Sequence, residues 1–346
     1  FQAEDGIRDC LLSRGLGDVY KRQDVSFGGT SKISFGSTSS DRTGVEAATR
    51  DALNADSTIS ASLSGELDNG WTVSGFMDDI SNGMTSSAIT IGMGSMGTIQ
   101  INQAATGVVD GYDDILPVAY EEINDGAQHA VRGMDAGSDV EAGSISYISP
   151  TIEMGGATMS VRGDFDPAAG AAASDGVGVA GAANTGAGLA YGGEINYGGL
   201  KIVAGYTEVE TTLENTTARS PNDKQSVLAT AVYSMGPISI GYGEWYTNEK
   251  DAADDYSTEG MSIAFAVNDE LSVSWGELED TKEATSDSAA VTAEMTAFQV
   301  AYTMGSMGIK LKHTDTDNGY HLSFIHISEP TRQEAISYAV FCLKKK

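Results

Sequence analysis

Residues 59–77 read ISASLSGELDNGWTVSGFM, and this stretch decides the fold. Apolar side chains alternate with smaller or polar ones on both sides of a short polar break; they are Ile59, Ala61, Leu63, Leu67, Trp71, Val73 and Met77. The break, Asp68-Asn69-Gly70, has the composition of a tight turn. Period-two alternation on both sides of such a turn predicts a β-hairpin with one apolar face.

This hairpin pattern occurs seven times between residues 24 and 322, and longer, mostly acidic segments separate the hairpins. A count along the chain predicts fifteen strands. A meander that opens and closes on the same side needs an even number, so a sixteenth strand should begin near Gly319. With its apolar face outside and its polar face inside, such a meander predicts an all-β fold, an antiparallel transmembrane β-barrel of ~16 strands with a water-filled interior.

The two ends of the chain lack this pattern. Residues 1–23 and 323–346 show no lasting alternation, and both resemble translated sequencing-adapter DNA. They contain both cysteines, Cys10 and Cys342, and eight of the twenty Lys and Arg residues. We therefore expect them to be foreign and outside the fold, with the signal peptide and the last strand missing. The alternative is a natural leader-like start and a natural basic tail.

The central segment 24–322 is strongly acidic, with 12 Lys and Arg against 43 Asp and Glu, a net charge of −31. Nucleic-acid phosphates need basic partners, so this charge argues against nucleic-acid binding. The sequence contains no run of ~18 apolar residues, so it predicts no membrane-spanning helix. The acidity alone would also suit a secreted or surface-anchored β-protein that acts as an adhesin.

Two features favour lipid around the sheet. Aromatic residues of outward parity gather near the short turns (Trp71, Tyr147, Tyr197, Tyr233, Tyr302) and near the long loops (Phe35, Phe165, Tyr206, Tyr242, Trp275). Two aromatic girdles are typical of a barrel that crosses two membrane interfaces. All five basic residues inside the expected strands have inward parity: Lys32, Arg162, Lys201, Lys310 and Lys312.

Residues 103–139 form the longest irregular segment and follow the fifth expected strand. The strand rhythm, the phrases GELDNGWTVSG (65–75) and GSMGTIQINQ (94–103), and this acidic loop resemble the general bacterial porins, trimeric outer-membrane diffusion channels of Gram-negative bacteria. In that family the third loop folds into the barrel, and its carboxylates face basic residues of the wall. The apolar run around Leu116 favours packing of the loop against another part of the protein; the alternative is a solvated surface loop.

The resemblance implies two sets of constriction residues. The acidic side would comprise Asp110, Asp113, Asp114, Glu121, Glu122 and Asp125, and the basic side Lys32, Arg162, Lys201, Lys310 and Lys312. It also implies a homotrimer in outer-membrane lipid that passes ions and small hydrophilic solutes. The negative charge predicts a preference for cations.

No arrangement of nucleophile, base and orienting carboxylate appears, so we expect neither an enzyme nor a cofactor. Gly92, Gly94 and Gly97 match a phosphate-loop spacing, but a strand follows them, so we interpret them as a turn. Asp315 and Asp317 weakly resemble a calcium loop without its closing acidic residue, so we expect an acidic outer loop there.

Overall fold

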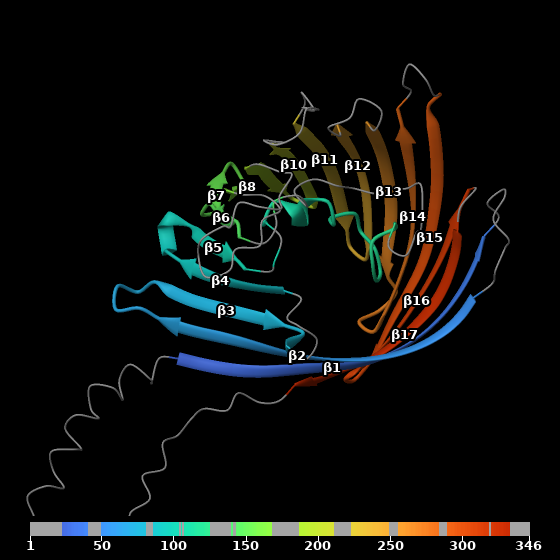
Figure 1. Cartoon of the computed structure of the whole chain (residues 1–346), viewed down its shortest axis with the longest axis horizontal. Helices are drawn as coiled ribbons and strands as arrows, with labels where there is room; N and C mark the ends of the chain where they lie inside the picture. The colour runs from blue at the N-terminus through green and yellow to red at the C-terminus, as the bar shows by residue number, and fades with distance from the viewer. Residues whose placement is uncertain are drawn as a thin grey trace, which may run out of the picture.

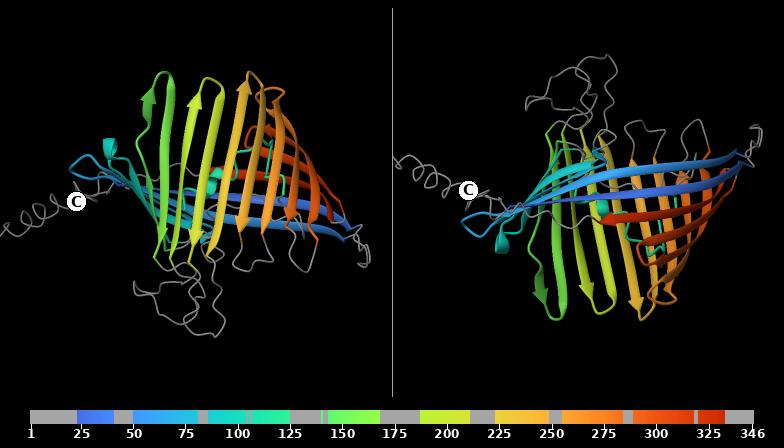
Figure 2. Two further views of the ribbon diagram at one scale, coloured as in Figure 1. Left: turned by 90° about the horizontal axis from the view of Figure 1, so that it is seen from above. Right: turned by 90° about the horizontal axis from the view of Figure 1, so that it is seen from below.

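A computed structural model describes residues 23–40, 50–80, 86–103, 105, 107–124, 140, 143–167, 187–210, 223–248, 255–283, 289–317 and 320–332. Its strands form one closed antiparallel sheet, seen end-on in Figure 1 and from two sides in Figure 2. The strands are β1 (Gln23–Ser40), β2 (Arg50–Glu66), β3 (Thr72–Asp78), β4 (Ser86–Gly92), β5 (Thr98–Asn102), β6 (Ile145–Ile148), β7 (Ile152–Met154), β8 (Ala157–Asp166), β9 (Gly188–Tyr197), β10 (Leu200–Val209), β11 (Lys224–Met235), β12 (Ile238–Asn248), β13 (Tyr256–Ala266), β14 (Leu271–Lys282), β15 (Val291–Met304), β16 (Met307–Thr316) and β17 (Tyr320–Arg332). Two 3-10 turns, η2 (Gly94–Met96) and η3 (Asp110–Tyr112), are also present.

The seventeen labelled strands make a sixteen-strand barrel because β6 and β7 share one partner. Ile148 pairs with Arg162, and Ile152 pairs with Met159. Residues 149–151 therefore lie opposite only two residues of β8, 160–161. The extra residue forms a β-bulge, and β6 and β7 are two parts of a single strand. Pro150 lies in the bulge, where its missing N–H breaks no ladder bond. The predicted fold class is thus confirmed.

The closing strand differs from the expectation. β17 pairs with β16 and also with β1 over Gly28–Ser40, so the barrel closes. The strand continues past Leu322 to Arg332, which corrects the prediction that residues from Ser323 onward take no part in the fold. In β17, Ile325 and Ile327 continue the outward alternation of apolar side chains. Without this strand, one edge of β1 and one edge of β16 would lack a partner.

The outer face carries the apolar alternation. Eight of the predicted girdle aromatics are exposed there: Tyr147, Tyr197, Tyr233 and Tyr302 near the short turns, and Phe35, Phe165, Tyr242 and Trp275 near the long loops. Trp71 and Tyr206 are half-buried. Among the described residues, no helix is long and apolar enough to cross a bilayer.

A row of glutamates crosses the outer face near the long loops. Glu244 lies opposite Glu259, Glu259 opposite Glu279, and Glu279 opposite Glu294. Directly opposed like charges destabilise a sheet, and charges on a lipid face are costly. This row therefore lies beyond the hydrocarbon layer and marks the upper limit of the barrel's apolar band.

Candidate functional site: a loop fixed inside the barrel

Residues 107–124, which we call the inner loop, lie inside the ring of strands, with η3 near its start (Figure 1). The loop begins at a buried carboxylate of β8. Asp164, 1% exposed, accepts hydrogen bonds from the N–H groups of Val108 (2.9 Å) and Val109 (2.8 Å). Arg162, two residues earlier on the same face, donates to the carbonyl of Val108 at 3.1 Å. Side chains of β8 thus provide hydrogen-bond partners for the N–H groups of Val108 and Val109 and for the carbonyl of Val108.

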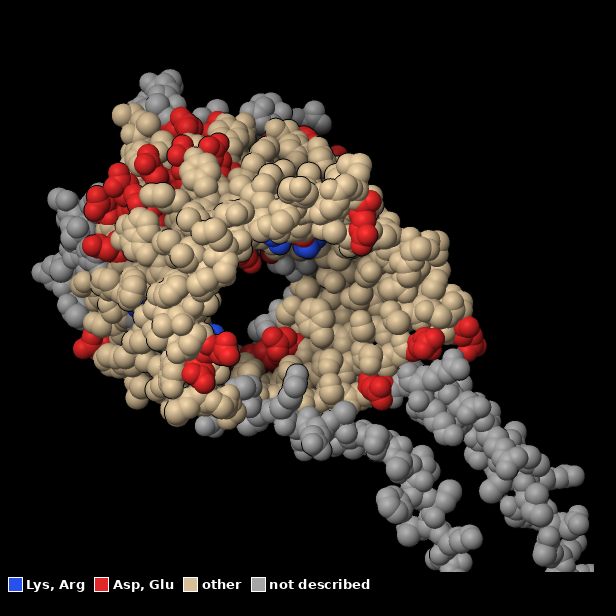
Figure 3. Space-filling model, turned by 180° about the vertical axis from the view of Figure 1, so that it is seen from behind, with Lys and Arg blue, Asp and Glu red and all other residues tan. Residues whose placement is uncertain are grey.

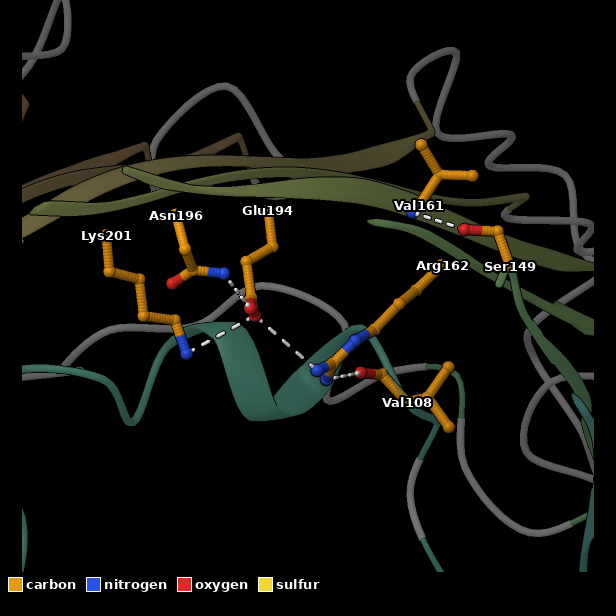
Figure 4. A network of polar contacts seen from close by, with 7 residues as sticks. All are labelled: Val108, Ser149, Val161, Arg162, Glu194, Asn196 and Lys201. Carbon is orange, nitrogen blue, oxygen red and sulfur yellow. Dashed lines mark hydrogen bonds and ion pairs between the residues drawn. The ribbon is translucent and has the colours of Figure 1, made fainter. Parts of the chain in front are cut away.

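Arg162 also belongs to a charged cluster on β8, β9 and β10, drawn in Figure 4. Its Nη2 lies 3.7 Å from Oε2 of Glu194, and Nζ of Lys201 lies 3.3 Å from the same oxygen. Asn196 donates to the other carboxylate oxygen at 2.7 Å. One carboxylate therefore partly neutralises two cations, and the cluster retains a net charge of +1.

The Arg162 guanidinium carbon lies 4.5 Å from the centre of the Tyr112 ring, in the geometry of a cation–π contact. Burial raises the pKa of the Tyr112 phenol above its usual value, and the nearby Arg162 opposes this only in part. Tyr112 is therefore neutral at physiological pH. This ring and the bonds to Val108 fix the first turn of the loop against β8 and β9.

The middle of the inner loop packs against the wall through apolar side chains. Val109, Tyr112, Leu116 and Ile123 form one buried cluster with wall residues that face inward; the wall members include Val203, Leu228, Trp245, Leu278 and Ala297. Apolar side chains at inward positions would be unfavourable in a wet lumen, so the loop and this wall cover each other. The interpretation as a solvated surface loop is wrong for the described part of the segment.

Inward glycines let the loop approach the strands closely. A Cβ added at Gly241 of β12 would lie 2.4 Å from Cδ of Pro117 and 2.9 Å from a methyl carbon of Leu116. A Cβ at Gly276 of β14 would lie 2.4 Å from the end of the Ile123 side chain. A larger residue at Gly241 requires the loop to move, and one at Gly276 requires the Ile123 side chain to move.

The end of the inner loop is held by polar side chains of β14, β15 and β16. Ser274 accepts a bond from the N–H of Ala119 at 2.8 Å. Gln299, 1% exposed, accepts from the N–H groups of Tyr120 (2.9 Å) and Glu121 (3.0 Å) and donates to the carbonyl of Glu121. Lys312 donates to the carbonyl of Glu122.

The structure places most of the predicted acidic residues on this loop. Asp113 is buried, Asp114 is exposed, and Asp110, Glu121 and Glu122 are half-buried. Asp125 lies outside the described residues. The five therefore occupy the barrel interior together, spread from η3 to the end of the loop.

All five predicted basic residues face inward, but they form two groups. Arg162 and Lys201 share Glu194, as described above. Lys32 of β1 lies 3.4 Å from Asp56 of β2, and Lys310 lies over the Tyr120 ring at 4.4 Å. Lys312 is only 2% exposed beneath the loop.

Sequence reasoning missed four residues that organise the site: Asp164, Glu194, Ser274 and Gln299. All four have the inward parity of their strands, which the alternation could have shown. Inward parity alone does not separate them from polar residues that only face water. Asp315 and Asp317 are exposed at the end of β16, and the described residues contain no group of three or more His, Cys, Asp or Glu arranged to hold a metal.

An opening runs through the barrel beside the inner loop. Figure 3 shows it with Lys and Arg atoms and Asp and Glu atoms at several places around its margin. A passage lined by charged side chains can order ions and dipolar solutes as they pass.

Solved structures of bacterial porins and other outer-membrane proteins share this fold. An anion-selective porin from Comamonas acidovorans matches with a TM-score of 0.63 at 12% identity, covering 89% of this chain and 100% of that one. The outer-membrane channel DcaP of Acinetobacter baumannii gives 0.63 at 10% identity, covering 90% and 98%. OmpT of Vibrio cholerae in its trimer form gives 0.61 at 11% identity, covering 90% and 100%. These identities show a shared fold only.

In sequence, the chain matches no curated protein. The model of the Gram-negative porin family, however, matches residues 13–323, which is most of the chain. The closed barrel, the outward aromatics and the internal loop agree with that match. The chain belongs to the Gram-negative porin family, and its place is the outer membrane.

Proposed function

We propose that this porin lets ions and small hydrophilic solutes diffuse passively through a charged constriction beside the inner loop. The observation that carries the proposal is the attachment of the loop to one wall of the barrel, beside the opening seen in Figure 3. Attached in this way, the loop narrows the lumen without closing it. The alternative of a secreted or surface-anchored adhesin is not favoured, because the family match is to porins.

We further propose a preference for cations. The central segment has a net charge of −31, and the inner loop adds carboxylates to the lumen. Among the basic candidates, Lys32 has Asp56 beside it, Arg162 and Lys201 have Glu194, and Lys312 is covered by the loop. The fold does not fix this preference, since the Comamonas porin of the same fold is anion-selective.

The test is a reversal potential across a planar bilayer with a KCl gradient. Cation preference gives a potential with the sign of K⁺ diffusion, and it should weaken at high salt as the fixed charges are screened. A potential with the sign of Cl⁻ diffusion would overturn the preference while leaving the channel itself intact. No conductance from correctly folded protein would overturn the diffusion proposal.

The assembly we propose is a homotrimer, as in the trimer form of OmpT from Vibrio cholerae. Cross-linking in detergent, followed by electrophoresis of heated and unheated samples, tests this. A ladder that ends at three chains is the expected result. Monomers alone, at protein concentrations where the channel conducts, would contradict it.

A further inference from the structure

The wall formed by β1–β4 differs from the wall beneath the inner loop. Its inward residues form two adjacent cross-strand rows: Asp24, Ser64, Ser74 and Thr90 in one, and Ser26, Ser62, Phe76 and Ala88 in the other. Hydroxyl side chains occupy three of the four positions in the first row and two of the four in the second, and the Ser26 and Ser62 hydroxyls are 2.6 Å apart. No described residue of the inner loop is bonded to them.

Within these rows lies a hollow of about 300 Å³. Its lining includes Asp24, Ser26, Ser62, Ser64, Phe76 and Thr90. This volume is at the lower end of the range for small-molecule sites, so it suits a solute of about one sugar ring. The lining holds one carboxylate and no basic side chain, which disfavours an anionic solute.

Phe76 gives the hollow an apolar surface. It pairs with Ser62 and Ala88, both inward, and its side chain is 39% exposed. The inward Trp245 of β12 and the Tyr112 ring of the inner loop, by contrast, are 2% and 1% exposed. A ring left in contact with water gains free energy when an apolar surface covers it.

The geometry points to a binding subsite for uncharged polyhydroxylated solutes, such as monosaccharides, on the β1–β4 wall. The C–H face of a pyranose ring covers Phe76, while its hydroxyl edge exchanges hydrogen bonds with the serine hydroxyls, which both donate and accept. Asp24 accepts a further bond. This inference rests on the proposed diffusion function and names a class of solute that dwells in the pore.

The experiment measures ion current through single channels in a planar bilayer as glucose is added. Glycerol at matched viscosity is the reference, because it lacks a ring with a C–H face. Glucose should reduce the wild-type current more than glycerol does. In Phe76→Ala the glucose concentration for half reduction should rise roughly threefold to tenfold, the range expected from one aromatic contact.

Two further variants keep the test sharp. Phe76→Leu retains an apolar side chain of similar size without the flat ring, so its glucose concentration for half reduction should also rise above that of the wild type. Met77→Ala changes the adjacent outward residue, which is 37% exposed, and should leave the effect unchanged. Conducting channels in which glucose and glycerol act alike, or in which Phe76→Ala and Phe76→Leu match the wild type, would overturn the subsite alone. Folded protein that never conducts would overturn the proposed function as well.

Discussion

The two inner walls of this barrel are built from the same kind of strand but from different residues. The wall from β8 to β16 turns apolar side chains and glycines inward, and the inner loop covers them. The wall from β1 to β4 turns serine and threonine inward, and much of it stays open to the lumen. Inward residues thus distinguish the surface that holds a loop from the surface that lines the water path.

The covered wall combines apolar packing with bonds to the loop backbone. Leu228, Leu278 and Met295 point into the barrel, where side chains would normally meet water, yet they are at most 1% exposed. At the two ends of the loop, Asp164 and Gln299 take up backbone groups that would otherwise be buried without partners. Four substitutions test how far this wall, rather than the loop alone, sets the pore.

The largest effect is expected from Asp164→Ala. It leaves the N–H groups of Val108 and Val109 without their acceptor in a buried place, which costs on the order of 3 kcal/mol. The free energy of unfolding in urea, followed by tryptophan fluorescence in lipid vesicles, should fall by about this amount. Single-channel current should become noisier as the start of the loop loosens. Asp164→Asn keeps one acceptor and should show a smaller loss; equal losses would contradict the capping role.

Gln299→Ala should have the next largest effect, because it removes bonds to Tyr120 and Glu121 at the end of the loop. We expect a loss of about 2 kcal/mol in the free energy of unfolding. Gln100→Ala is the matched control, since Gln100 bonds only to the wall residues Thr90 and Asn102 among its described hydrogen bonds. Increased current noise in Gln299→Ala but not in Gln100→Ala is expected. The opposite order would mean that Gln299 does not hold the loop.

Gly241→Ala tests the close approach of loop and strand. The added methyl group overlaps Pro117 and should displace the loop into the lumen, at a cost of about 1–2 kcal/mol. Single-channel conductance should fall because the passage narrows. Gly193→Ala is the control, since its Cβ would meet only ordinary contacts of 3.6 Å or more. Unchanged conductance in Gly241→Ala would show that loop position does not set the pore width.

The smallest effect is expected from Glu194→Gln, which removes the carboxylate shared by Arg162 and Lys201. The cluster then carries a charge of +2 rather than +1, so the proposed cation preference should weaken. We expect one partly exposed charge to change the free energy of a passing ion by about 0.4 kcal/mol, which corresponds to roughly a twofold change in the cation-to-anion permeability ratio. Glu279→Gln, on the outer face, should leave the reversal potential unchanged. A shift toward cations in Glu194→Gln would refute this electrostatic role.

The sequence predicts the barrel well because alternation is a local property. The hairpin around Asp68-Asn69-Gly70 and the inward parity of Lys32, Arg162 and Lys201 follow directly from counting residues. The closing strand was mispredicted because Ser323–Arg332 resembles foreign sequence. Pairing with two open edges depends instead on backbone N–H and C=O groups, which every residue of this stretch except Pro330 supplies in full.

The internal loop is harder to predict because its contacts join distant parts of the chain. The apolar run around Leu116 indicated packing against something, and that was confirmed. Which strands it meets depends on barrel closure, so Gln299, 178 positions from Glu121, could not be paired with it from the sequence. The charge partners Asp56 and Glu194 likewise become visible only once strand register is known.

The most direct test compares the two walls by thiol accessibility in a channel from which Cys10 and Cys342 have been replaced by serine. Ser62→Cys lies on the open wall, whereas Thr230→Cys lies on the covered wall, where Thr230 is 2% exposed. A charged, water-soluble thiol reagent should modify Ser62→Cys quickly and reduce the single-channel current, and it should react far more slowly with Thr230→Cys. Equal rates and equal loss of current at both positions would show that the inner loop does not cover this wall.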